Sequence, residues 1–176
     1  MAEFIQKHKL FSFYSTLMII VVLIAIFAPW LAPGDAFSSN LSQALQAPSS
    51  QHWFGTDKLG RDVLSRIIYG TQLSLFMGVS IVVIMVSIGT IIGAVAGYFG
   101  GKIEMVLMRL ADIMLSFPGV VLAIAIAGIL GGSIVNTIIA LSVVGWAKYA
   151  RIVRSMTLKV RGEEYVTAAV MMGAST

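Results

Sequence analysis

Between Leu73 and Phe99 the chain reads LSLFMGVSIVVIMVSIGTIIGAVAGYF, without one acidic or basic side chain. A helix needs about 20 consecutive, mostly apolar residues to cross the hydrocarbon core of a bilayer. This stretch has that length and that character. It predicts a membrane-spanning helix at 73–99, and we expect the fold class to be an all-α membrane helix bundle.

The composition of the whole sequence agrees with this prediction. Hydrophobic residues make up 58% of the 176 residues and charged residues only 11%, whereas soluble domains carry about 25% charged residues. The mean hydropathy of +0.93 leaves too few polar residues to cover a soluble domain. The net charge of +4 then serves membrane topology rather than nucleic-acid binding.

Residue types that build catalytic or metal sites are scarce. The sequence has no cysteine, which excludes a disulfide framework, a thiolate metal site and a cysteine nucleophile. Its two histidines, His8 and His52, lie outside the apolar stretches, and no charged residue falls in the middle of a span. Intramembrane charges usually mark ion or proton routes, so a proton-coupled carrier and an intramembrane aspartyl protease are disfavoured. We expect no catalytic residue, cofactor or metal ion.

An earlier apolar stretch predicts a first span at 13–31, which Pro29 and Pro33 bring to an end. Lys7 and Lys9 precede it, as basic residues precede the apolar part of a signal peptide. The stretch is longer than the 7–15 residues typical of that part. We therefore interpret it as an uncleaved membrane anchor.

The uncharged stretch after Asp112 predicts two helices rather than one. As a single helix, it would reach about 50 Å, which is too long for one span. The sequence Gly-Gly-Ser at 131–133 breaks it near the middle. We expect helices at 103–130 and 134–149, the first of them bent at Pro118, where neighbouring helices can satisfy the freed carbonyl.

The distribution of basic residues predicts that both ends of the chain are cytoplasmic, because cytoplasmic loops carry an excess of Lys and Arg. On this reading the cytoplasmic side holds Lys7, Lys9, Lys102, Arg109, Lys148, Arg151, Arg154, Lys159 and Arg161. The expected organisation is a cytoplasmic N-terminus at 1–12, transmembrane helices at 13–31, 73–99, 103–130 and 134–149, an external segment at 32–70, and a cytoplasmic loop at 150–176.

Within the external segment, residues 56–68 have the pattern of a short amphipathic helix. Thr56 or Asp57 can cap its start, and apolar side chains recur on one face: Leu59, Val63, Leu64 and Ile67. We expect this helix to lie on the outer membrane interface and a turn at 69–72 to follow it. The alternative is a loop helix packed on a small soluble core.

Gly89, Gly93 and Gly97 recur every four residues in the span 73–99. They form a ridge without side chains, which lets another helix approach closely. The ridge can serve packing within the chain, packing on a partner subunit, or the lining of a wide pore. In the third helix, Arg109 and Asp112 lie three residues apart on one face and are expected to form a local ion pair.

The C-terminal stretch 165–173 reads YVTAAVMMG and follows a cluster of basic residues. It predicts a short helix rich in small side chains, a shape that fits a groove on another protein. The alternative is an amphipathic helix that rests on lipid headgroups.

Several ordered motifs resemble one family, the second permease subunit ("C" type) of dipeptide, oligopeptide and nickel ATP-binding-cassette (ABC) importers. They cover most of the chain from Trp53 onward. The motifs are FGTDKLGRDVLSRIIYGTQLSL at 54–75, AGYFGG at 96–101, RLAD at 109–112, LSFP at 115–118 and WAKYARIVR at 146–154.

The family's cytoplasmic loop contains Glu-Ala-Ala, three residues and Gly, then Ile-x-Leu-Pro. Ala168, Ala169 and Gly173 match the first half, and Thr167 stands in the place of the Glu. The second half and the last two of the family's usual six spans fall beyond Thr176. The resemblance therefore implies a C-terminally truncated member.

The resemblance also implies partners: a second permease subunit, two ATPase subunits, an extracytoplasmic substrate-binding protein and membrane lipid, in a bacterial or archaeal cytoplasmic (inner) membrane. The chain lacks the phosphate-binding motif Gly-x-x-x-x-Gly-Lys-Ser/Thr, so the ATPase subunits would hydrolyse ATP. A coupling helix would dock on them through Glu164, Tyr165, Thr167, Ala168, Ala169 and Gly173. The external helix would offer the binding protein Asp57, Gly60, Arg61, Asp62 and Arg66.

The implied cargo is a peptide first and nickel second, and no span residue can be assigned to it. The alternative function is a small four-span scaffold or assembly protein, which would use the glycine ridge to hold partners without transporting anything.

Overall fold

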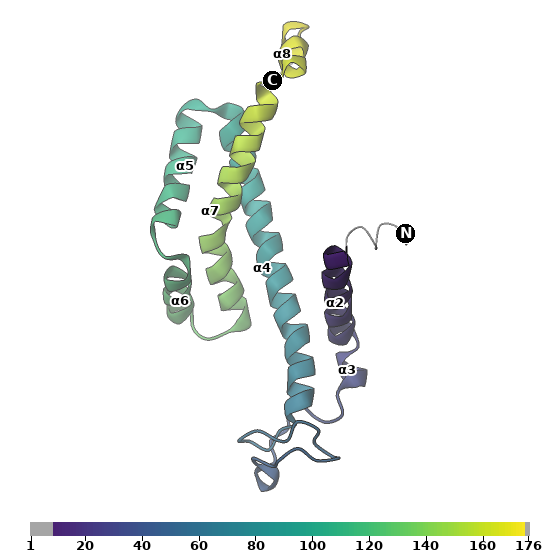
Figure 1. Ribbon diagram of the computed structural model, residues 1–176. Coiled ribbons are helices and arrows are strands. Elements are labelled where there is room, and N and C mark those ends of the chain that lie inside the picture. The colour runs from purple at the N-terminus through teal and green to yellow at the C-terminus, as the bar shows by residue number, and fades with distance from the viewer. Residues whose placement is uncertain (1–8, 175–176) are drawn as a thin grey trace. The chain divides into compact units, whose positions relative to one another are not determined.

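The computed structural model describes residues 9–174 (Figure 1), and within them every regular element is a helix. The predicted all-α fold class is therefore confirmed. Most of the expected cytoplasmic N-terminus, 1–12, lies outside the described residues. The α-helices are α2 (Lys9–Ile26), α3 (Ala28–Leu31), α4 (Val63–Phe99), α5 (Gly101–Ser116), α6 (Gly119–Leu130), α7 (Ile134–Arg161) and α8 (Glu164–Met171), and a 3-10 helix, η1, covers Leu41–Gln43.

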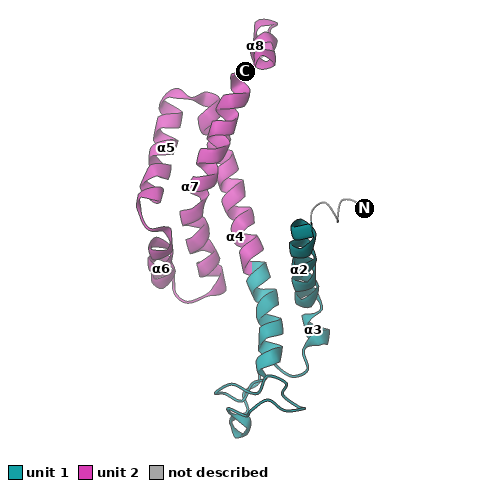
Figure 2. Ribbon diagram, in the orientation of Figure 1, with its two compact units in different colours: residues 1–76 teal, residues 77–176 magenta. Residues whose placement is uncertain are grey.

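The chain forms two compact units, residues 1–76 and 77–176 (Figure 2). Helix α4 belongs to both, since its first turns complete the first unit and its remainder is part of the second. In the first unit, α2 stops at Ile26 and α3 follows with Pro29 in its first turn. The expected single helix at 13–31 is thus two helices, because proline is favoured in a first helical turn and disfavoured inside a helix.

Two helices, α2 and α4, are each long and apolar enough to cross a membrane. The pair α5 and α6 would make a third span if the two form one bent span. Helix α7 covers the expected span 134–149 but continues to Arg161. Its apolar half is flanked by polar residues, so length and composition alone do not mark α7 as a span.

The expected amphipathic helix at 56–68 is wrong. Residues 56–62 form turns closed by a bridge between Thr56 and Asp62, and α4 begins only at Val63. Gly55 and Gly60 have φ angles of +71° and +72°, which a right-handed helix does not allow. The turn expected at 69–72 is also wrong, because α4 runs through it without interruption.

In the second unit, α4 and α7 pack closely along the three glycines. A Cβ atom added to Gly93 would lie 2.4 Å from the carbonyl oxygen of Ala150. Atoms added to Gly89 and Gly97 would lie 2.5 Å and 2.7 Å from the Cβ atoms of Tyr149 and Thr157. The glycines therefore face a helix of the same chain, where any side chain would push α7 away.

Figure 1 shows α5 and α6 alongside α7. We expected one bent helix at 103–130, but α5 and α6 meet at 90°. Phe117 is extended and Pro118 caps α6. A residue that precedes proline is pushed out of the helical region by the proline ring, so the bend becomes a complete break. Both helices pack on α7, whose buried residues include Ala140, Val144 and Ala147.

We predict opposite effects for the same substitution at two glycines of α4. Gly93→Ala should lower the free energy of unfolding by about 1–3 kcal/mol, as overpacking does. Gly78→Ala should raise it by up to about 1 kcal/mol, since alanine is the better helix former and nothing lies within 4 Å of its added Cβ. Thermal unfolding in detergent micelles, followed by circular dichroism, measures both. Equal effects would contradict the packing of α4 on α7.

Candidate functional site

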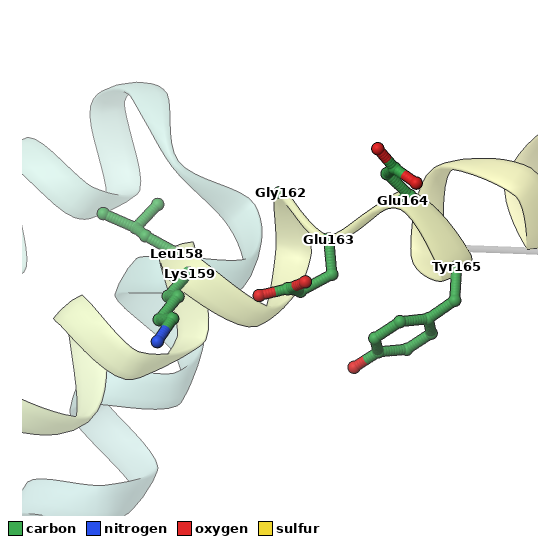
Figure 3. Close-up of a pocket in the computed structure, with 6 residues that line it drawn as sticks. All are labelled: Leu158, Lys159, Gly162, Glu163, Glu164 and Tyr165. Atoms are coloured by element: carbon green, nitrogen blue, oxygen red, sulfur yellow. The ribbon is translucent and has the colours of Figure 1, made fainter.

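The short helix α8 lies at the end of α7 and is joined to it by Gly162 and Glu163 alone. A pocket of about 600 Å³ opens at this joint, and Figure 3 shows the side chains that line it. The Glu164 carboxylate points away from the side chains of Glu163 and Tyr165. Acidic residues at the start of a helix are stabilised by its dipole, so this pair of glutamates favours a helix that begins at residue 164.

Gly173 ends α8 in a left-handed conformation, with φ of +96°. The N–H of Gly173 donates to the carbonyl of Val170, and that of Ala174 to the carbonyl of Ala169, both at 3.0 Å. These two bonds form a Schellman motif, which satisfies carbonyls at the end of a helix and favours glycine. The matching glycine of the sequence motif therefore has a clear backbone role.

Helix α8 exposes apolar side chains at the end of the chain's basic segment. Tyr165 is 64% exposed and Met171 is 82% exposed, and Thr167 and Ala168 are also exposed. A groove of about 800 Å³ separates α8 from the end of α4 and is lined by Tyr98, Phe99, Arg161, Tyr165, Val166, Thr167, Ala169, Val170, Met171 and Ala174. Exposed apolar side chains therefore gather on this short helix and along the groove beside it.

Polar contacts join the last turns of α7 to α4 and α5. The Arg161 guanidinium donates to the carbonyl oxygen of Tyr98 at 3.0 Å, and Arg154 pairs with Glu104. Arg151 pairs with Asp112 at 2.5 Å. The expected local pair of Asp112 with Arg109 is therefore wrong, because Asp112 turns toward α7 rather than along its own helix.

The loop between α3 and α4, at 32–62, is the part predicted above to be external and is called the external loop below. The Asp57 carboxylate organises this loop. It accepts the backbone N–H groups of Leu59 at 2.8 Å and Arg61 at 3.1 Å. The guanidinium groups of Arg61 and Arg66 pair with it as well. Burial works against ionisation, but the hydrogen bonds and charge from Arg61 outweigh it and hold the pKa of Asp57 well below its ordinary value.

Asp62 caps α4. Its carboxylate accepts the backbone N–H of Ser65 at 2.7 Å and lies 3.0 Å from Nδ1 of His52. Asp62 is only 3% exposed. Burial raises its pKa, but the hydrogen bonds from Ser65 and His52 dominate and leave the pKa below its ordinary value. The buried Ser65 hydroxyl in turn accepts the N–H of Gly34 at 3.0 Å.

Gly60 completes this loop. A Cβ atom there would lie 1.8 Å from the carbonyl oxygen of Asn40. All the predicted external residues thus lie together, but they hold the loop in shape instead of presenting a helix. His52 could not be identified from the sequence as the partner of Asp62, because a contact across ten residues of irregular loop follows no periodicity. Three apolar neighbours of these residues are exposed, Trp53 (66%), Phe54 (57%) and Leu59 (42%), and so are the charged residues Lys58 and Arg66.

Comparison with known proteins gives matches at both ends of the chain. Residues 89–176 match the family described as "Binding-protein-dependent transport system inner membrane component". Residues 5–48 match "N-terminal TM domain of oligopeptide transport permease C". These two ranges include α8 and the start of the external loop.

Several curated relatives are similar over nearly the whole chain. A dipeptide transport system permease protein of Alkalihalophilus pseudofirmus is 44% identical over 96% of this chain and 56% of its own length. An oligopeptide transport system permease protein of Bacillus subtilis is 37% identical over 97% and 56%. A nickel transport system permease protein of Escherichia coli is 38% identical over 88% and 56%. The chain thus spans about half the length of the curated relatives it matches.

We predict that acid loosens the external loop. A carboxyl group whose pKa is lower in the folded state stabilises that state above its unfolded pKa, and the contribution disappears as the pH falls through the folded value. Asp57 and Asp62 should therefore lose their contributions below their ordinary value of 3.8. Fluorescence of Trp53, in a chain with Trp30 and Trp146 replaced by Phe, should change as the pH falls from 6 to 2. Asp62→Asn should show the loosened signal already at pH 6, and an unchanged signal would contradict its role as a cap.

We predict that Gly173→Ala frays α8. A left-handed residue with a Cβ costs about 1–2 kcal/mol, which should speed hydrogen–deuterium exchange in residues 164–171. Gly162→Ala is the matched control, since Gly162 has a right-handed helical conformation and tolerates a side chain. Mass spectrometry of the two variants measures the difference, and equal exchange would argue against the Schellman motif.

Proposed function

This chain belongs to the family of binding-protein-dependent transport system inner membrane components, and on that premise we propose that it is a permease subunit of an ABC importer. With a second permease subunit, it would form the path for a solute across the cytoplasmic membrane. The observation that supports this proposal most directly is α8, a short exposed helix at the end of a braced α7. A helix in this place would pass the movement of a bound partner on to α7.

The partners at α8 would be ATPase subunits. The sequence contains no Gly-x-x-x-x-Gly-Lys-Ser/Thr motif, which a nucleotide-binding loop of that type needs. ATP would therefore be bound and hydrolysed by separate subunits. Closure of an ATPase pair on ATP would move α8 and shift the permease between inward-open and outward-open states, as ligands shift a two-state equilibrium.

The docking surface would consist of the exposed and half-buried residues of α8. Tyr165 and Met171 offer apolar area, while Thr167 and Ala168 leave room for a groove wall to approach. Glu164 adds a carboxylate at the start of the helix, and Gly173 fixes its end. An apolar helix face that enters a groove is a recurrent mode of recognition.

The external loop would receive a substrate-binding protein. Its skeleton is fixed by Asp57 and Asp62, and its exposed surface carries Trp53, Phe54 and Leu59. Large apolar side chains on a rigid loop lose little entropy on binding. The four charged residues expected to contact the binding protein are engaged in hydrogen bonds and ion pairs within the loop: Asp57, Arg61, Asp62 and Arg66. The contact with the binding protein would therefore be made by the apolar side chains instead.

The cargo would be a peptide, with nickel as the second candidate. The relatives reported above are named for dipeptide, oligopeptide and nickel transport, and peptides are the class most of them share.

The proposed orientation places both ends of the chain in the cytoplasm. The basic residues of α5 and α7 would then lie on the inner side of the membrane, as the positive-inside rule requires.

We predict that Ala168→Arg abolishes docking of the ATPase subunits. Ala168 is exposed on α8, so arginine fits the isolated chain but adds bulk and charge to the face that would enter a groove. Co-purification in mild detergent with the cognate ATPase and second permease subunits measures binding. Ser155→Arg, on an exposed position of α7, is the control and should bind as the unmodified chain does.

Loss of the ATPases from Ala168→Arg alone supports the importer. Equal binding of all three chains would place the docking surface elsewhere. An unmodified chain that binds the second permease but no ATPase would favour the scaffold function instead.

A further inference from the structure

Arg154 joins three helices of the second unit. It lies on α7, and its backbone fills the space left by two glycines of α4. A Cβ atom on Gly93 would lie 3.0 Å from the Arg154 nitrogen, and one on Gly97 would lie 2.9 Å from its carbonyl oxygen. Its guanidinium reaches α5, where Nε donates to Oε1 of Glu104 at 2.6 Å and a terminal nitrogen donates to the same oxygen.

This ion pair is partly shielded from solvent. The side chains of Glu104 and Arg154 are 22% and 32% exposed, whereas those of Asp112 and Arg151, which also join α5 to α7, are 52% and 53% exposed. Exposed pairs contribute little, because water and salt screen them. Partly buried charges lose less of their attraction to screening. The Glu104–Arg154 pair is therefore the stronger of the two ion pairs that join α5 to α7, and it is called the brace below.

The position of the pair along the chain gives it a consequence for α8. Two turns of α7 separate Arg154 from its end at Arg161, and α8 follows directly. Arg161 adds a hydrogen bond to the Tyr98 carbonyl at the end of α4. Beyond the break at Pro118, by contrast, α6 has no ion pair to α7 among the described residues. Polar contacts therefore join the end of α4, helix α5 and the second half of α7, while α6 is held by apolar packing.

We propose that Glu104 is a positioning residue, which acts through Arg154 to make α4, α5 and α7 move as one rigid body when α8 moves. The inference rests on the proposed function, since it assigns the path by which movement of α8 reaches the membrane helices. Without the pair, α7 would bend or rotate against α5, and movement of α8 would be lost before it reached the solute path. The position of α8 on the ATPase would be unaffected.

The test uses the complete transporter, with the variants Glu104→Gln, the exchanged pair Glu104→Arg with Arg154→Glu, and Asp112→Asn as the solvent-exposed control. Glu104→Gln should still co-purify with the ATPases and keep its basal ATP hydrolysis. Peptide uptake per ATP hydrolysed should fall about two- to thirtyfold, the range over which such couplings are modulated. The exchanged pair should restore much of that loss, and Asp112→Asn should have little effect.

A second measurement decides the inference even if the proposed function fails. The sequence has no cysteine, so spin labels attach to this chain only where Cys is introduced, here at the exposed positions Met105 on α5 and Met156 on α7. Pulsed electron resonance should give a narrow distance distribution, broader in Glu104→Gln and narrow again in the exchanged pair.

Each result has a defined meaning. If the unmodified transporter takes up neither peptide nor nickel, the proposed function fails, and the distance distribution still tests the brace. An unchanged distribution in Glu104→Gln overturns the inference. So does uptake per ATP that stays the same, or a loss of assembly that the exchanged pair does not reverse, because that pattern indicates a role in stability alone.

Discussion

The close approach of α4 and α7 is the constraint on which the second unit depends. Three glycines one turn apart present no side chain of their own to α7, so the backbone of α7 can approach that of α4 closely. Lipid surrounds membrane helices with an apolar medium, which leaves packing rather than water exclusion to hold them together. Once α7 is fixed on α4, its other faces are available to α5 and α6, and its end determines where α8 begins.

The membrane character of the chain could be predicted from sequence because it depends on local composition. The stretch 73–99 is free of charged residues and mostly apolar, and the Gly-Gly-Ser at 131–133 does separate two helices. The glycine ridge was also visible, since its period of four is a helical period. Its partner was not, because the sequence of one helix does not say whether its neighbour comes from the same chain or another.

The errors have a common cause. The helix expected at 56–68 rested on apolar periodicity and a capping residue, but the backbone there is set by Gly55 and Gly60, which the helical pattern ignored. The pair Arg109–Asp112 was chosen by spacing within one helix, whereas Asp112 contacts Arg151, far away in sequence. The break at Pro118 was underestimated, although proline and its preceding residue both disfavour a continuous helix. Periodicity describes regular elements and fails where side chains or glycines decide the backbone.

The external loop separates the residues that shape it from those that face outward. The carboxylates of Asp57 and Asp62 and the backbone of Gly60 are committed to hydrogen bonds and close contacts within the loop, while the side chains of Trp53 and Leu59 are exposed. The outward residues can therefore be exchanged without disturbing the start of α4. For protein engineering, this makes the loop a graftable platform, on which a new recognition surface requires substitutions at only a few exposed positions.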